Sequence, residues 1–123
     1  MLSQILVVAL GGALGAVIRF LNNKLVVHYF LAQLYWATLI VNVIGCFLMG
    51  IAFMWFQNKF QHSENLLLFI TVGFLGALTT WSTFSMEAVM MINTGEVLKG
   101  FVYILATLVC CLLAFYFGMK ILA

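Results

Sequence analysis

The sequence predicts an all-α membrane protein with four transmembrane helices in a single domain spanning residues 1–123. Of its 123 residues, 67% are hydrophobic and only 7% are charged, and the mean hydropathy is +1.24. A soluble domain carries about a quarter charged residues, so this chain could not cover a surface that faces water. The net charge of +2 and the lack of a basic run argue against a nucleic-acid partner. We expect a multi-pass protein of a lipid bilayer, the cell (inner) membrane.

The first two predicted spans are apolar runs with one strongly polar side chain each. Residues 5–20 end near Arg19 and place Gly11 and Gly15 four apart, which gives one helical face suited to close packing. Residues 21–36 mix polar and aromatic types and are expected to form an interfacial connection. Residues 38–56 are long enough to cross about 30 Å of hydrocarbon. Asn42 within them must face protein or water.

The third predicted span, residues 66–92, is longer than the roughly 20 residues needed to cross a bilayer. A polar loop, QNKFQHSEN at 57–65, precedes it, and we expect His62 there to be solvated rather than a metal ligand. Gly73, Gly76 and the pair Thr79–Thr80 predict a helix broken near the membrane centre. Broken helices expose carbonyl groups and half-helix ends that can hold an ion.

The fourth predicted span, residues 100–118, carries Tyr103 and Thr107 on one face, and the sequence assigns them no role. The cysteines lie in apolar segments without a CxxC spacing. They are interpreted as small buried hydrophobic residues rather than as a disulfide framework or a zinc site. They are Cys46, Cys110 and Cys111.

Lysine and arginine residues are spread almost evenly over the two expected sides of the membrane. Four spans place both termini and the 57–65 loop on one side, together with Lys59 and Lys120. The other side carries Arg19, Lys24 and Lys99. Because the Lys/Arg bias normally sets orientation, this balance allows insertion both ways. Four short spans also enclose a pore poorly, so we expect oligomerisation, and dual insertion permits an antiparallel arrangement.

Three stretches resemble the Fluc (CrcB) family of fluoride channels. They are GGALGAVIRF (11–20), TLIVNVIGCFLMG (38–50) and GFLGALTTWSTFSME (73–87), in the family's order and spacing. The fourth span carries no such signature. The resemblance implies an antiparallel, dual-topology homodimer with two pores at the subunit interface, which expels fluoride passively and so reduces fluoride toxicity. It implies no enzymatic activity.

The resemblance also implies a set of functional residues. The fluoride pathway would comprise Arg19, Asn42, Thr80, Trp81, Ser82, Thr83, Phe84 and Glu87. A structural sodium ion at the dimer centre would be held by the backbone carbonyls of Gly76 and Thr79. One residue departs from the family pattern, because Trp81 stands where the family usually has phenylalanine.

The chemistry of these side chains suits a small, strongly hydrated anion. The hydroxyls of Ser82 and Thr83 and the NH2 group of Asn42 can replace water around fluoride. Trp81 and Phe84 are three residues apart and share a helical face, where their electropositive ring edges would meet an anion. A ring pair at this spacing is nevertheless more often plain packing.

Two other readings follow from the residues. A small four-span multidrug transporter needs a carboxylate in its first span, and residues 1–18 contain no Asp or Glu. A non-transporting assembly subunit, in which Asn42 and the Ser/Thr cluster only hold helices together, stays open from the sequence alone. An enzyme is not indicated, because Ser, His and acidic residues are not grouped.

Overall fold

The computed structural model describes residues 1–30, 33–58 and 63–123, and the regular structure in these ranges is helical. Four stretches are long and apolar enough to cross a membrane, which confirms the predicted all-α membrane protein. The elements are α1 (Leu2–Tyr29), α2 (Leu34–Asn58), α3 (Glu64–Leu67), the π-helix η1 (Leu68–Leu75), α4 (Gly76–Leu78), α5 (Trp81–Asn93) and α6 (Val97–Leu122). The elements α3 to α5 together form the third span.

The helices extend beyond the predicted apolar runs. Residues 21–36 do not form a connection as expected, because α1 continues to Tyr29 and α2 begins at Leu34. No glycine or proline lies between Gly15 and Gly45 to end a helix, and Asn22 Nδ2 donates to the Ala37 carbonyl at 3.1 Å. His62 and Lys59 belong to the polar loop predicted at residues 57–65, and both lie outside the described residues.

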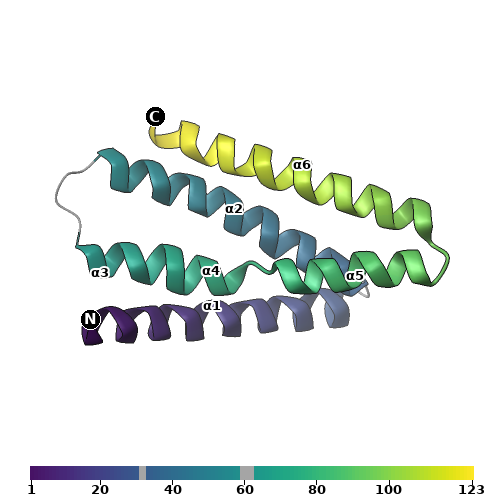
Figure 1. Ribbon diagram of the computed structural model, residues 1–123, viewed down its shortest axis with the longest axis horizontal. Helices are drawn as coiled ribbons and strands as arrows, with labels where there is room; N and C mark the ends of the chain where they lie inside the picture. Colours follow the sequence, from purple (N-terminus) through teal and green to yellow (C-terminus); the bar gives the residue numbers. More distant parts are fainter. Residues whose placement is uncertain (31–32, 59–62) are drawn as a thin grey trace.

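Both chain termini lie at the same end of the bundle as the end of α2 and the start of α3, as the sequence predicts (Figure 1). Two side chains join the helices there. Asn58 Nδ2 donates to the Leu122 carbonyl at 2.8 Å, and Gln4 Nε2 donates to Glu64 Oε1 at 2.9 Å. Neighbours along the chain therefore alternate in direction, and α2 and α6 run the same way (Figure 1).

Glycines allow α1 to lie directly against the first half of the third span. A Cβ atom at Gly11 or Gly15 would collide with the carbonyl oxygen of Phe69 or Phe74, respectively. At Gly73 it would lie 2.8 Å from the Val8 carbonyl oxygen. The predicted small-residue face is therefore confirmed, and it packs backbone against backbone as membrane helices with glycine-rich faces do.

The third span is interrupted at its midpoint. The helix ends at Leu78 and restarts at Trp81, and the two residues between are extended, with ψ of 156° at Thr79 and 119° at Thr80. The predicted break is confirmed. The π-helix that precedes it was not predicted. Gly45 of α2 makes room for the break, because a Cβ atom there would collide with the methyl group of Thr79.

The α1 contact can be tested with two neighbouring glycines. Gly15→Ala should lower the free energy of unfolding by about 1–3 kcal/mol, because the added methyl group meets backbone that cannot move aside easily. Gly12→Ala is the matched control, since its Cβ would have only the Gly73 carbonyl oxygen nearby, at 4.0 Å. The measurement is the midpoint of thermal unfolding in detergent. Equal midpoints for the two variants would show that close packing of α1 does not matter.

Candidate functional site

The break in the third span is closed by one amide side chain from α2. Asn42 Oδ1 accepts from the Thr80 N–H at 2.8 Å, and Asn42 Nδ2 donates to the Thr80 carbonyl at 3.1 Å. Both residues are buried, with Asn42 7% and Thr80 8% exposed. The side chain thus replaces the backbone partner that the Thr80 N–H loses at the break, and it adds a second donor to the Thr80 carbonyl, which as the N-cap carbonyl already accepts the first hydrogen bond of α5. One N–H of the Asn42 amide is left for another acceptor.

Three hydroxyl groups gather where α5 begins. Thr80 caps this helix, and its Oγ1 accepts from the Thr83 N–H at 3.2 Å. The same oxygen lies 3.1 Å from Thr83 Oγ1 and 3.3 Å from Ser82 Oγ. Since two hydrogen bonds join three hydroxyls, one O–H proton of this cluster remains unused. The structure therefore brings Thr80, Ser82 and Thr83 together, as the sequence predicted.

The two carbonyls predicted to bind sodium lie on the other side of the break. In a continuous helix the Gly76 carbonyl would accept from the Thr80 N–H, and the Thr79 carbonyl from the Thr83 N–H. Those two donors are instead given to Asn42 and to the Thr80 hydroxyl. The break thus leaves both carbonyls without their helical partners, and carbonyl oxygens are suitable ligands for a hard cation.

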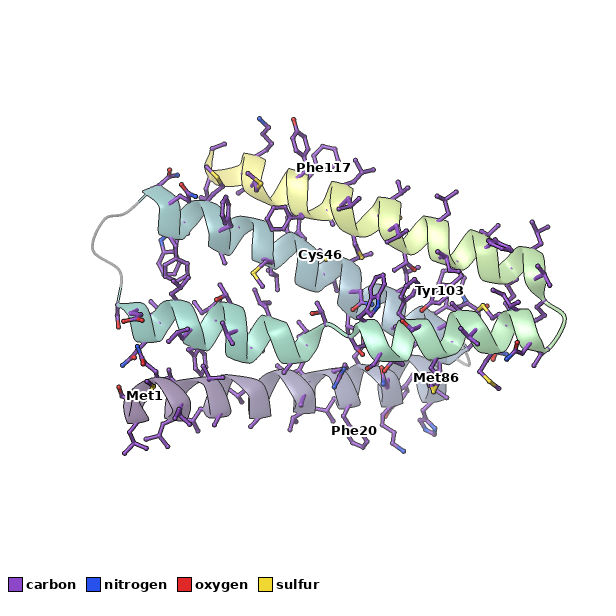
Figure 2. All side chains as sticks on the ribbon, viewed as in Figure 1. Met1, Phe20, Cys46, Met86, Tyr103 and Phe117 are labelled. Atoms are coloured by element: carbon purple, nitrogen blue, oxygen red, sulfur yellow. The ribbon has the colours of Figure 1, made fainter. Side chains whose placement is uncertain are left out.

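The two predicted pathway rings lie together but differ in exposure. The ring centroids of Trp81 and Phe84 are 5.0 Å apart. Phe84 is only 4% exposed and also contacts Tyr103, with a centroid distance of 5.3 Å, whereas Trp81 is 68% exposed. Figure 2 labels Tyr103 on α6, close to α5. One ring therefore packs into the chain and the other faces outward.

Glu87 is the centre of a hydrogen-bonded group that the sequence did not assemble. Thr38 Oγ1 donates to Glu87 Oε1 at 2.9 Å, and the Tyr103 hydroxyl donates to Glu87 Oε2 at 2.7 Å. A surface pocket of about 240 Å³ reaches Glu87 and is also lined by Tyr35 and Lys99. The four-residue spacing of Thr38 from Asn42 was the available signal, because it places both on one face of α2.

Two further residues complete the description. Thr107 is 4% exposed, and its Oγ1 is buried without a hydrogen-bond partner among the described residues. Such an unsatisfied group is uncommon and indicates a place where a ligand or water can bind. Arg19, by contrast, makes no hydrogen bond or ion pair with the other predicted pathway residues, all of which the structure describes.

Two comparisons with known proteins bear on this arrangement. The model of the CrcB-like protein, Camphor Resistance (CrcB) family matches residues 6–119. The chain belongs to the CrcB family. Among curated CrcB relatives, the fluoride-specific ion channel FluC of Hahella chejuensis is 46% identical over 93% of this chain and 90% of its own length. The FluC proteins of Dehalococcoides mccartyi and Campylobacter jejuni are 42% and 40% identical, over 95% and 98% of this chain and 90% and 98% of their own lengths.

The names of these CrcB relatives describe channels, which confirms the expectation of a channel family rather than an enzyme. No group of three or more His, Cys, Asp or Glu side chains that could hold a metal lies within residues 1–30, 33–58 and 63–123. The individual pathway residues stay predictions, and the structure adds Thr38, Tyr103 and Thr107 to them.

Replacing the Asn42 amide tests whether it holds the break. Asn42→Leu should leave the Thr80 N–H buried without a partner, at a cost of about 1–3 kcal/mol. The loss would appear as a lower unfolding midpoint in detergent and as faster protease cleavage near residues 79–80. Asn93→Leu, at the exposed end of α5, is the control and should change neither. An unchanged midpoint for Asn42→Leu would refute the structural role.

Proposed function

We propose that the chain is a fluoride-selective channel that exports fluoride passively and so lowers its concentration in the cytoplasm. The observation that carries the proposal is the mid-span break, which places the start of α5 and a group of hydroxyl donors halfway along a membrane span. Its membership of a family whose relatives are named fluoride-specific ion channels supports fluoride as the ion.

The N-terminus of α5 favours an anion at this depth. A helix carries roughly half a positive charge at its N-terminus, from peptide N–H groups without helical partners. The helix beginning at Trp81 is 13 residues long, which is enough for this effect. In a bilayer, where water is excluded, such a partial charge attracts an anion more strongly than it would at a wet surface.

Donors along the route remain available to replace the water around fluoride. Three groups have a donor without a partner among the residues that the structure describes: the second N–H of Asn42, one O–H proton of the Thr80 cluster and the Thr107 hydroxyl. Neutral donors bind an anion weakly enough for it to leave again, as conduction requires. The pocket at Glu87 would supply the aqueous mouth, with Lys99 at its rim to attract anions.

We also propose that the chain works as an antiparallel homodimer of dual topology in the inner membrane. Support comes from the exposed position of Ser82 and Trp81 at mid-span. A hydroxyl or indole N–H facing lipid there would be costly, whereas a second copy would cover it and close the pathway. The nearly even distribution of lysine and arginine permits the opposite orientations that this dimer requires.

A structural sodium ion at the centre of the dimer completes the proposal. The carbonyls of Gly76 and Thr79 would hold it, since both have lost their helical donors at the break. A bound cation would attract the carbonyl oxygens exposed at the break of each chain, and would so hold the two chains together. This role is structural, so the ion would take no part in fluoride movement.

Ion flux from liposomes tests the proposed function directly. Purified protein in vesicles loaded with potassium fluoride should release fluoride without ATP or a pH gradient once a potassium ionophore balances the charge. Vesicles loaded with potassium chloride should release almost nothing, because chloride is larger and accepts short hydrogen bonds less readily. Comparable release of the two anions would contradict the proposal, as would fluoride release that depends on a pH gradient.

Phe84 separates a role in the pathway from a role in packing. Phe84→Ile should abolish fluoride release while the protein still elutes as the parent does in size-exclusion chromatography. An apolar replacement of roughly comparable bulk should cost only about 1–2 kcal/mol of stability. Phe101→Ile is the control, because Phe101 is 60% exposed on α6, and it should conduct normally. Normal conduction by Phe84→Ile would show that this ring only packs.

A further inference from the structure

The helices α2 and α6 lie side by side in a fixed register. A Cβ atom at Gly50 would collide with the carbonyl oxygen of Phe115, and Thr38 and Tyr103 donate to the two oxygens of the same Glu87 carboxylate. In both pairs the second residue is 65 positions beyond the first. Because the two helices run the same way (Figure 1), the pairing repeats with each turn between these points. The register places Cys46 opposite Cys111.

The contact between the two thiols agrees with this register. Cys46 and Cys111 are close enough to interact electrostatically, and both cysteines are partly buried and free. Figure 2 labels Cys46 on the part of α2 that runs beside α6. The helix backbones also lie in close contact at Gly50, one turn from Cys46, and at Gly118, where a Cβ atom would collide with the Phe47 carbonyl oxygen. The two cysteines are therefore neighbours across the contact between α2 and α6.

We propose that Cys46 and Cys111 form a two-ligand site for a soft divalent metal ion that prefers linear coordination, the mercuric ion being the test case. Each thiol would lose its proton as its sulfur binds the metal. Two S–H bonds break, two metal–sulfur bonds form and two protons leave to water. No electron is transferred, so no oxidant is needed.

Charge favours a divalent ion at this place. Two thiolates and one divalent cation make a neutral unit, which avoids the cost of burying a net charge between membrane helices. Thiolate ligands select soft metals, whereas zinc in proteins takes four ligands or three with a water. No third His, Cys, Asp or Glu ligand joins the pair within the described residues, so zinc should bind poorly.

The site would act on the pathway because of its position. Thr107, whose buried hydroxyl has no partner among the described residues, lies one helical turn from Cys111 on α6. In the same register it lies opposite Asn42. A metal that clamps α2 to α6 at this level would fix the helices that carry these two groups, and we expect it to inhibit fluoride release. This consequence rests on the proposed function, whereas the metal site itself does not.

Stoichiometry tests the site without any transport measurement. The variant Cys110→Ser, which removes the exposed neighbouring thiol, would be incubated with excess mercuric chloride, freed of unbound metal and weighed by intact mass spectrometry. One mercury per chain, with both remaining thiols blocked toward maleimide, is the expected result. Two mercury ions per chain, one on each thiol, would overturn the proposal. So would zinc uptake equal to that of mercury.

Flux measurements then test inhibition. Mercuric chloride should inhibit fluoride release by the parent and by Cys110→Ser at similar concentrations. Cys46→Ser and Cys111→Ser should each need at least about 10–100-fold more metal, the loss seen when a group that merely supports a metal ligand is removed. Unchanged release with the metal bound would overturn the inhibitory effect. A parent that releases no fluoride even without metal would contradict the proposed function and leave the stoichiometric test intact.

Discussion

The structure depends above all on the pair of hydrogen bonds between the Asn42 amide and the Thr80 backbone. An interrupted helix inside a membrane leaves N–H and carbonyl groups that water cannot reach, and each costs several kcal/mol if it stays unpaired. The Asn42 side chain satisfies the Thr80 N–H, which has lost its helical acceptor, and ties α2 to the Thr80 carbonyl through its own N–H. Only with that cost removed can α5 begin, and α4 end, halfway along the span.

The elements that could be predicted from sequence are those fixed by local composition. Four apolar runs without proline predict four spans, and the cluster around Gly76 and Thr79 predicts the break, because these residues are poor at continuing a helix. The predicted end of α1 was wrong, because the mixture of polar and aromatic residues at 21–36, which includes Asn22 and Lys24, indicated a connection. Polar residues near a membrane surface are equally compatible with helix, and only the contact of Asn22 with Ala37 distinguishes the two.

The site was predicted as a set of residue types rather than as a set of contacts. Asn42 was expected to donate to an anion or to join helices, and the structure shows the second while leaving one N–H for the first. The partners of Glu87 come from α2 and α6, distant in sequence by 49 and 16 residues. No pattern within a single helix contains that information. Thr107 was noticed for its spacing, but its lack of a partner is visible only in three dimensions.

In the proposed function the same polar groups serve structure and conduction, and their hydrogen bonds leave donors for both. Thr80 uses its backbone to hold the break and its hydroxyl to cap α5, yet the surrounding cluster still keeps one free O–H proton. Replacing such a residue removes both functions, so lost flux would not identify the pathway by itself. Phe84 makes ring contacts but is not part of that network. A role of the Phe84 ring in conduction can therefore be tested without disturbing the hydrogen bonds that hold the break.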